Sequence, residues 1–329
     1  MSIAFGCAAE PDAAWAGRVE MLAWSLRTFG GALADAPLHA CFAGPIDDVV
    51  AAPLRALGVH VHVVERFDPR LSYANKLRLL ELDLAPGIDA LAMVDCDIVF
   101  AGDPSPYLPV DRVAAKPADR DPLDRAGWVR LCGALGLPVP PRDVVATCTG
   151  RAMPRYWNSG VVVIPRDQLV SMRDAWRGWL HRVVGLLDDD PLIVPRARRL
   201  FADQYALMAA MAEHESVALP LAANCPTHVP IHRSVPLGGE PALLHYHART
   251  WPDGLLQRPV AGVVRPAAHR YNVGRAEALE LRFTELRDPP PHERARDAVG
   301  AGADLVRASR MFTRVRAAAA RGRESRPVA

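Results

Sequence analysis

The feature that most constrains the fold is a regular alternation of short apolar runs and longer amphipathic segments in the first hundred residues. The apolar runs predict four strands, at Ile3–Ala8, Leu38–Phe42, Val59–Val64 and Ala90–Val94. The segments between them have helical spacing and predict helices at Asp12–Phe29, Asp47–Leu57 and Tyr73–Leu84. This alternation predicts an α/β fold with a Rossmann-like, mostly parallel central sheet and flanking helices.

The second half of the chain is less regular. Residues 103–156 are rich in Pro, Asp and Arg, with one helical stretch near Arg125–Leu135, and we interpret them as an insertion or lid. A strand at Val161–Ile164, helices at Gln168–Leu187 and Phe201–Met211, and a late strand at Leu243–His247 are predicted after it. We therefore expect a main domain over residues 1–258 and a helical, Arg-rich extension over residues 259–329.

Composition excludes several classes of function. The 329 residues carry a formal net charge of only +2, which argues against a nucleic-acid partner. There is no run of about 18 apolar residues and no basic region followed by an apolar run, so we expect neither a transmembrane helix nor a signal peptide. The six cysteines are scattered without a CxxC pair, which predicts a reduced, cytoplasmic protein. The preference for Arg over Lys, with abundant Ala, Pro and Val, indicates a bacterial source.

Two aspartates at positions i and i+2 directly follow the fourth predicted strand, in the run Met93-Val94-Asp95-Cys96-Asp97. Such carboxylates can converge on one hard cation, to which a diphosphate adds further oxygen ligands. The metal would offset charge on the leaving group when a sugar–phosphate bond breaks. The alternative is a strand end with two solvated or capping aspartates.

Five short motifs occur in a fixed order along the chain: Ser72–Leu77, Met93–Asp97, Trp157–Val161, Asp203-Gln204 and His245-Tyr246. With them, about residues 1–255 resemble the GT-A fold glycosyltransferases of family eight, the relatives of glycogenin and of the lipopolysaccharide galactosyltransferases. The resemblance implies transfer of a hexosyl group from a nucleoside diphosphate sugar, a UDP-sugar being favoured. It also implies a hydroxyl acceptor and retention at the anomeric carbon. The acceptor could be a glycan, a lipid-linked molecule or a small molecule.

The resemblance assigns a role to each matching residue. Asp95, Asp97 and His245 would bind Mn²⁺ or Mg²⁺, and an imidazole ligand favours Mn²⁺. Lys76 would meet the donor near its diphosphate or sugar. Asn158 would face the sugar, and Asp203 would lie near the sugar or acceptor, so both are candidate catalytic residues. The remaining expected donor-binding residues are Cys7, Ala8, Cys96, Ser159 and Arg249.

Each of these residues also has a purely structural explanation. Asn158-Ser159-Gly160 could form a turn that leads into a strand, and Asp203 could be a charge at a helix N-terminus. His245 could be an ordinary strand histidine, and Lys76 a solvated helix residue.

The late His-aromatic motif departs from the family pattern. The family usually continues with Gly and then Lys-Pro-Trp, whereas this chain continues with His247-Ala248-Arg249. Arg249 is a candidate replacement for the phosphate-binding lysine. His247 is an alternative metal ligand, because residues two apart on a strand point the same way.

The C-terminal segment from Arg294 to Arg326 interleaves arginines with apolar residues. This pattern predicts either peripheral contact with the anionic inner face of a membrane or a solvated terminus.

Three other functions share parts of these patterns. In a haloacid-dehalogenase-like, Mg²⁺-dependent phosphatase, Asp95 would be the nucleophile and Asp97 the general acid/base. That motif normally opens its domain, whereas three predicted strands precede it here. A sugar-nucleotide pyrophosphorylase needs a Gly-rich loop with Arg after the first strand, which this chain lacks. A module that binds a nucleotide sugar without turnover is the third alternative.

Overall fold

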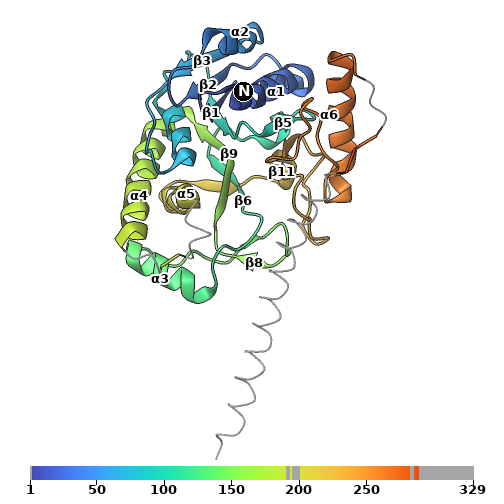
Figure 1. Ribbon diagram of the computed structural model, residues 1–329. Helices are drawn as coiled ribbons and strands as arrows, with labels where there is room; N and C mark the ends of the chain where they lie inside the picture. Colours follow the sequence, from blue (N-terminus) through green and yellow to red (C-terminus); the bar gives the residue numbers. More distant parts are fainter. Residues whose placement is uncertain (1, 190–192, 195–200, 282–284, 289–329) are drawn as a thin grey trace, which may run out of the picture. The chain divides into compact units, whose positions relative to one another are not determined.

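A seven-stranded sheet forms the centre of the fold in the computed structural model, which describes residues 2–189, 193–194, 201–281 and 285–288 (Figure 1). The strands lie in the order β10-β6-β9-β4-β1-β2-β3. Their bounds are β1 Ile3–Ala9, β2 Leu38–Phe42, β3 Val59–Val63, β4 Ala90–Val94, β6 Val113–Pro117, β9 Trp157–Pro165 and β10 Ser216–Ala218. Only β9 runs antiparallel to its neighbours, β4 and β6, so the sheet is mixed but mostly parallel.

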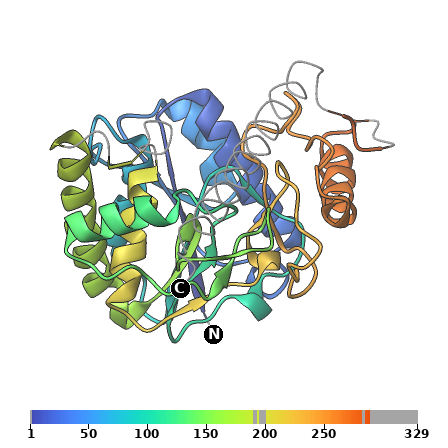
Figure 2. The same ribbon diagram turned by 90° about the horizontal axis from the view of Figure 1, so that it is seen from below.

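Helices cover both faces of this sheet. One face packs against α1 (Ala13–Phe29) and α2 (Asp48–Ala56). The other packs against the 3₁₀ segment η2 and the helices α3, α4 and α5 (Figure 2), which span Ser72–Glu81, Arg125–Leu135, Leu169–Asp189 and Ala202–Ala212. Successive residues of β1 alternate between the two cores, as expected of a strand covered on both faces.

Aspartates define where several helices begin. The side chain of Asp12 accepts hydrogen bonds from the backbone N–H groups of Ala14 and Trp15 at the start of α1. Asp47 and Asp124 cap α2 and α3 in the same way. These caps satisfy N–H groups that have no partner within the helix.

A second, three-stranded sheet lies beside the first and has the order β11-β12-β5. It is made of β5 (Ile98–Phe100), β11 (Cys225–Pro226) and β12 (Leu243–His245), and α6 (Arg265–Ala278) packs on the same small core. The remaining strands, β7 (Val144–Val145) and β8 (Ala152–Met153), pair with each other. Because β12 pairs antiparallel with β5, the late part of the chain returns to the residues that follow β4.

Three sequence-based expectations need correction or refinement. The helix expected at Tyr73–Leu84 is a 3₁₀ helix over Ser72–Glu81. The late strand ends at His245, two residues earlier than expected. Residues 103–156, interpreted as an insertion or lid, supply β6 to the central sheet; movement of the rest as a lid stays a prediction.

The compact unit runs from Met1 to Leu286 and so continues past the domain boundary expected at residue 258. The Arg-rich tail expected to contact membrane lies outside the described residues. Within the described residues, no helix has the length and apolar character needed to cross a membrane.

Three histidines on β2 and β3 form a stacked group on one face of the sheet edge. His39 pairs in register with His60, and the rings of His60 and His62 both stack on that of His39. His39 Nδ1 lies 3.0 Å from His62 Nε2. Burial, together with the neighbouring His60 and His62, lowers the pKa of His39 to about 4.

This group predicts a loss of stability in mild acid. Between about pH 6.5 and pH 4 the unfolded chain binds a proton at His39 that the folded protein does not, so stability falls as the pH falls. We expect His39→Gln to reduce this pH-dependent loss by on the order of 1 kcal/mol, since the ring is only half-buried. Urea unfolding of both proteins at neutral pH and near pH 4.5 measures the difference; an equal loss in both would contradict the prediction.

Candidate active site

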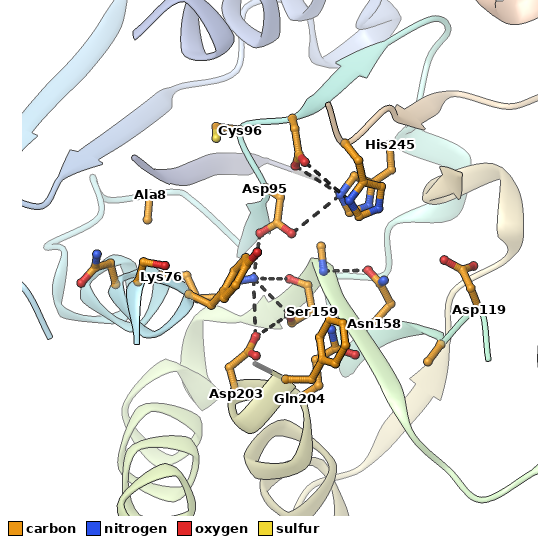
Figure 3. Close-up of a pocket in the computed structure, with 18 of the residues that line it drawn as sticks. Ala8, Lys76, Asp95, Cys96, Asp119, Asn158, Ser159, Asp203, Gln204 and His245 are labelled. Carbon is orange, nitrogen blue, oxygen red and sulfur yellow. Dashed lines mark hydrogen bonds and ion pairs between the residues drawn. The ribbon is translucent and has the colours of Figure 1, made fainter. Parts of the chain in front are cut away.

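The candidate active site lies at one edge of the central sheet, where β1, β4 and β6 end and β9 begins. Because β9 is antiparallel to β4, its first residues lie beside the residues that follow β4. A cavity of about 480 Å³ opens at this edge and is lined from all four strands (Figure 3). Ligands of open α/β sheets bind at this end of the strands.

Lys76 forms the centre of a buried polar cluster. Its Nζ lies 2.7 Å from Asp95 Oδ1 and 3.8 Å from Asp203 Oδ2, and it donates to the backbone oxygen and the hydroxyl of Ser159. Ser159 Oγ in turn donates to Asp203 Oδ2 at 2.7 Å. Lys76 is therefore not a solvated helix residue: η2 carries it into the site, where it joins residues that follow β4, begin β9 and begin α5 (Figure 3).

The charges of this cluster are shifted by burial and by each other. Burial alone would lower the pKa of Lys76, but Asp95 and Asp203 raise it above its usual value, so the ammonium stays charged. Burial raises the pKa of Asp203, and Lys76 opposes that rise. Asp203 lies in the first turn of α5 but is buried and hydrogen-bonded, so it is more than a charge at a helix end.

A second group of side chains surrounds Asp97. β12 pairs His245 with Ile98, and this places His245 Nε2 3.2 Å from Asp97 Oδ1 and 3.9 Å from Asp95 Oδ2. Burial would raise the pKa of Asp97, but His245 and His247 hold it well below its usual range. The antiparallel pairing of β5 and β12 thus explains why residues about 150 positions apart in the sequence meet.

His247 joins this group by a different route from the one expected. The strand ends at His245, and His247 adopts the left-handed conformation (φ 52°). The turn places its ring 4.1 Å from that of His245, nearly parallel to it. Non-glycine residues in this conformation are uncommon, and they occur often at functional sites.

The residues of this group fit a divalent metal ion. Asp97, His245 and His247 each offer a ligand atom, and these atoms lie within 4.8 Å of one another. His245 Nε2 is buried and faces two carboxylates, those of Asp97 and Asp95. Mixed carboxylate and imidazole ligands suit Mn²⁺ and its neighbours in the transition series.

Asn158 sits inside β9 rather than in a turn. Its Oδ1 accepts hydrogen bonds from the backbone N–H of Gly160 and from Asn224 Nδ2. A Cβ at residue 160 would lie 2.6 Å from His245 Cε1 and 2.7 Å from Asn158 Oδ1, so glycine is required for both side chains to pack here. With Oδ1 occupied, the amide nitrogen of Asn158 is the part left to donate toward a ligand.

Most of the predicted site residues line the cavity, but two do not. Ala8, Cys96 and Ser159 line it together with the predicted metal-binding and catalytic residues. Cys7 points the other way and is fully buried in the core between the sheet and α1, so its thiol cannot contact a donor in the cavity. Arg249, expected to replace the phosphate-binding lysine, is buried outside the cavity lining.

Sequence reasoning missed several residues of the cavity. Trp15 and Arg18 reach it from α1, with the guanidinium 4.7 Å from the centre of the indole ring. Asp119 follows β6 and forms a 2.5 Å ion pair with Lys116, the only other lysine of the chain. A β-bulge between Ala115 and Lys116 marks this position. The scarcity of lysine was a usable signal, because both lysines are buried beside an aspartate of the site.

Residues 20–215 match the family described as the Rhodobacterales glycosyltransferase domain, which covers more than half of the chain. The chain belongs to this family. It is therefore a glycosyltransferase, and the phosphatase alternative for Asp95 and Asp97 is wrong. Because the family is one of glycosyltransferases, the sugar-nucleotide pyrophosphorylase and the module that binds a nucleotide sugar without turnover are excluded as well.

Comparison with solved structures identifies the fold of this glycosyltransferase as GT-A. An active-site mutant of LgtC is 15% identical, with a TM-score of 0.51, over 89% of this chain and 99% of LgtC. The galactosyltransferase LgtC in complex with donor and acceptor sugar analogues is 16% identical, with a TM-score of 0.51, over 90% of this chain and 99% of LgtC. No curated protein matches the sequence.

Proposed function

We propose that this glycosyltransferase moves a hexosyl group from a nucleoside diphosphate sugar, with a UDP-sugar favoured, to a hydroxyl acceptor. The observation that carries the proposal is one cavity that holds two distinct groups of side chains. Asp97, His245 and His247 form a metal-binding group, and Lys76, Ser159 and Asp203 form a hydrogen-bonding group. Asp95 lies between them, with one oxygen on Lys76 and the other facing His245.

The metal-binding group would hold Mn²⁺ or, less well, Mg²⁺. Asp97 and His245 would be ligands, with His247 or Asp95 completing the protein's contribution. When bound, the ion supplies positive charge that offsets the charge developing on the departing nucleotide. His245 binds metal only as a neutral imidazole, so binding must displace the proton that Asp97 favours on the metal-free ring.

Arg18 is a better candidate than Arg249 for a second positive charge on the nucleotide. It lines the cavity, whereas Arg249 does not. Its guanidinium stacks on the ring of Trp15 and helps to lower the pKa of Asp97, and no carboxylate of the described residues forms an ion pair with it. A guanidinium stacked in this way keeps its N–H groups available for a diphosphate.

Sugar orientation would depend on residues from β9 and α5. The amide nitrogen of Asn158 can donate to a sugar hydroxyl, since its oxygen is already bonded. Asp203 is held by Ser159 and Lys76, which fixes the direction of its carboxyl group. Retention at the anomeric carbon is proposed from the family resemblance. The cytoplasmic location and the peripheral membrane contact of the tail stay predictions from the sequence.

LgtC has been solved with donor and acceptor sugar analogues, and we propose that the cavity here likewise receives both substrates. The acceptor class, a glycan, a lipid-linked molecule or a small molecule, is left open by the proposal.

Turnover of activated sugars tests the proposal. We expect Mn²⁺-dependent release of nucleotide from one class among UDP-, GDP- and dTDP-hexoses, by slow hydrolysis or by transfer to an added sugar acceptor. NMR of the freed hexose early in the reaction should show the α anomer from an α-linked donor. Nucleotide release with the opposite anomer would contradict retention, and no release from any donor would contradict the proposed reaction.

A further inference from the structure

We infer that Asn224 is a positioning residue that holds His245 in the tautomer able to bind metal through Nε2 and couples that ring to the sugar-facing Asn158. The inference rests on the proposed metal-dependent function. Asn224 lies between the 3₁₀ turn Leu221–Ala223 and β11, and it is 1% exposed. None of the sequence motifs includes it.

A series of hydrogen bonds links Gly160, Asn158, Asn224 and His245, and the backbone donor of Gly160 determines the direction of each. The backbone N–H of Gly160 can only donate, so the Asn158 atom 2.8 Å from it must be the amide oxygen. Asn224 contacts that same oxygen at 2.9 Å and must therefore do so with its NH₂ group. The other end of the Asn224 amide is then an oxygen, and it lies 3.2 Å from His245 Nδ1.

The tautomer of His245 follows from this orientation. An amide oxygen can only accept, so Nδ1 must carry the proton. In a neutral ring the lone pair is then on Nε2, the atom that faces Asp97 and Asp95. The opposite tautomer would place two acceptors against each other at Nδ1 and would direct a proton, not a lone pair, to the metal position.

The remaining contacts of His245 restrict the ring further. The ring lies on the bare Cα of Gly160 and stacks on the ring of His247. Nδ1 is bonded to Asn224, and Nε2 faces Asp97 Oδ1 at 3.2 Å. Asn224 therefore provides the one polar contact recorded for Nδ1, and the same amide is bonded to Asn158. Metal-binding histidines commonly depend on such a partner, whose loss weakens metal binding.

The test compares three variants of the full-length protein. Asn224→Leu keeps the approximate volume but removes the acceptor. Asn224→Asp keeps an acceptor for Nδ1 but removes the donor to Asn158. Asn272→Leu is the matched control, because Asn272 is an equally buried asparagine whose amide bonds to the backbone of Leu256.

Mn²⁺ affinity, measured without nucleotide by electron paramagnetic resonance, is the first readout. We expect Asn224→Leu to weaken it by about 10- to 100-fold and Asn224→Asp to stay within about threefold of wild type. Asn272→Leu should lower the melting temperature without changing the affinity. The inference is overturned if Asn224→Leu binds Mn²⁺ like wild type, or if both Leu variants weaken binding equally.

The Nδ1 proton itself is the second readout and separates this inference from the proposed function. In the metal-free protein Asp97 lies 3.2 Å from Nε2, so near neutral pH we expect a proton on both ring nitrogens. ¹H–¹⁵N NMR should then show the Nδ1 proton of His245 hydrogen-bonded and slow to exchange in wild type, and fast to exchange in Asn224→Leu. If wild type binds no Mn²⁺, the proposed function fails, and this spectrum still decides the inference: a wild-type Nδ1 proton that exchanges rapidly, or an unchanged signal in the variant, overturns it.

Discussion

Replacing Asp97 with alanine is expected to abolish the metal-dependent part of nucleotide binding. Among the described residues, Asp97 is the carboxylate with oxygens within 4 Å of both His245 and His247. Its pKa is held below the usual range, so it is ionised at neutral pH. Its removal deletes a charged ligand and leaves Asp95, whose Oδ2 lies 3.9 Å from His245 Nε2, as a more distant carboxylate. We expect Mn²⁺-dependent affinity for the nucleoside diphosphate to fall at least about 100-fold, with a similar or larger loss of turnover.

Asp111→Asn is the matched control for this prediction. Asp111 is an exposed aspartate that pairs only with the neighbouring Arg112, so its loss should change neither binding nor turnover. Circular dichroism and thermal unfolding of Asp97→Ala should show a folded protein. Full Mn²⁺-dependent binding by folded Asp97→Ala would remove this aspartate from the metal site.

Replacing Lys76 with glutamine is expected to have the second largest effect, on stability as well as on turnover. Lys76 is 6% exposed, and it is the cation that balances Asp95 and Asp203. Without it, buried carboxylate charge is left uncompensated, and removing one partner of a buried pair commonly costs about 3–5 kcal/mol. Asp203 would then ionise less readily, because Lys76 is the largest influence that lowers its pKa.

A double variant shows whether this loss comes from unbalanced charge. If it does, Lys76→Gln combined with Asp95→Asn should be more stable than Lys76→Gln alone, because the second change removes one unpaired carboxylate. Urea unfolding of the wild type, both single variants and the double variant completes the cycle. Strictly additive losses would show that Lys76 stabilises the fold by packing alone.

The strands of the N-terminal half could be predicted because most of their residues are apolar. β1 and β4 are almost fully buried, whereas the edge strand β3 alternates Val with His and is only partly buried. The fourth run, Ala90–Val94, is followed directly by Asp95, and ligands of such sheets bind beyond the carboxyl ends of the strands. The helix expected from Asp12 to Phe29 was also predictable, and in the structure Asp12 caps it through hydrogen bonds to its own neighbours. These features need no knowledge of distant contacts.

The rest of the site depends on distant contacts that spacing does not encode. Cys7 and Ala8 are adjacent, so their side chains lie on opposite faces of β1. The packing of helices on the two faces of the sheet decides that Ala8, and not Cys7, lines the cavity. Arg18 was one arginine of an amphipathic helix, and only the packing of that helix on the sheet brings it to the cavity. His247 reaches Asp97 through a left-handed turn, although a continued strand was the reason given for it in the sequence.

Calorimetric titration of the wild-type protein with UDP, GDP and dTDP, each with Mn²⁺ and with a chelator, tests the metal-bridged donor site most directly. We expect one nucleotide, UDP in the first instance, to bind tightly with Mn²⁺ and at least about 100-fold more weakly without it. Equal affinity with and without metal, or no binding of any nucleotide, would contradict a metal-bridged diphosphate held by Asp97 and His245.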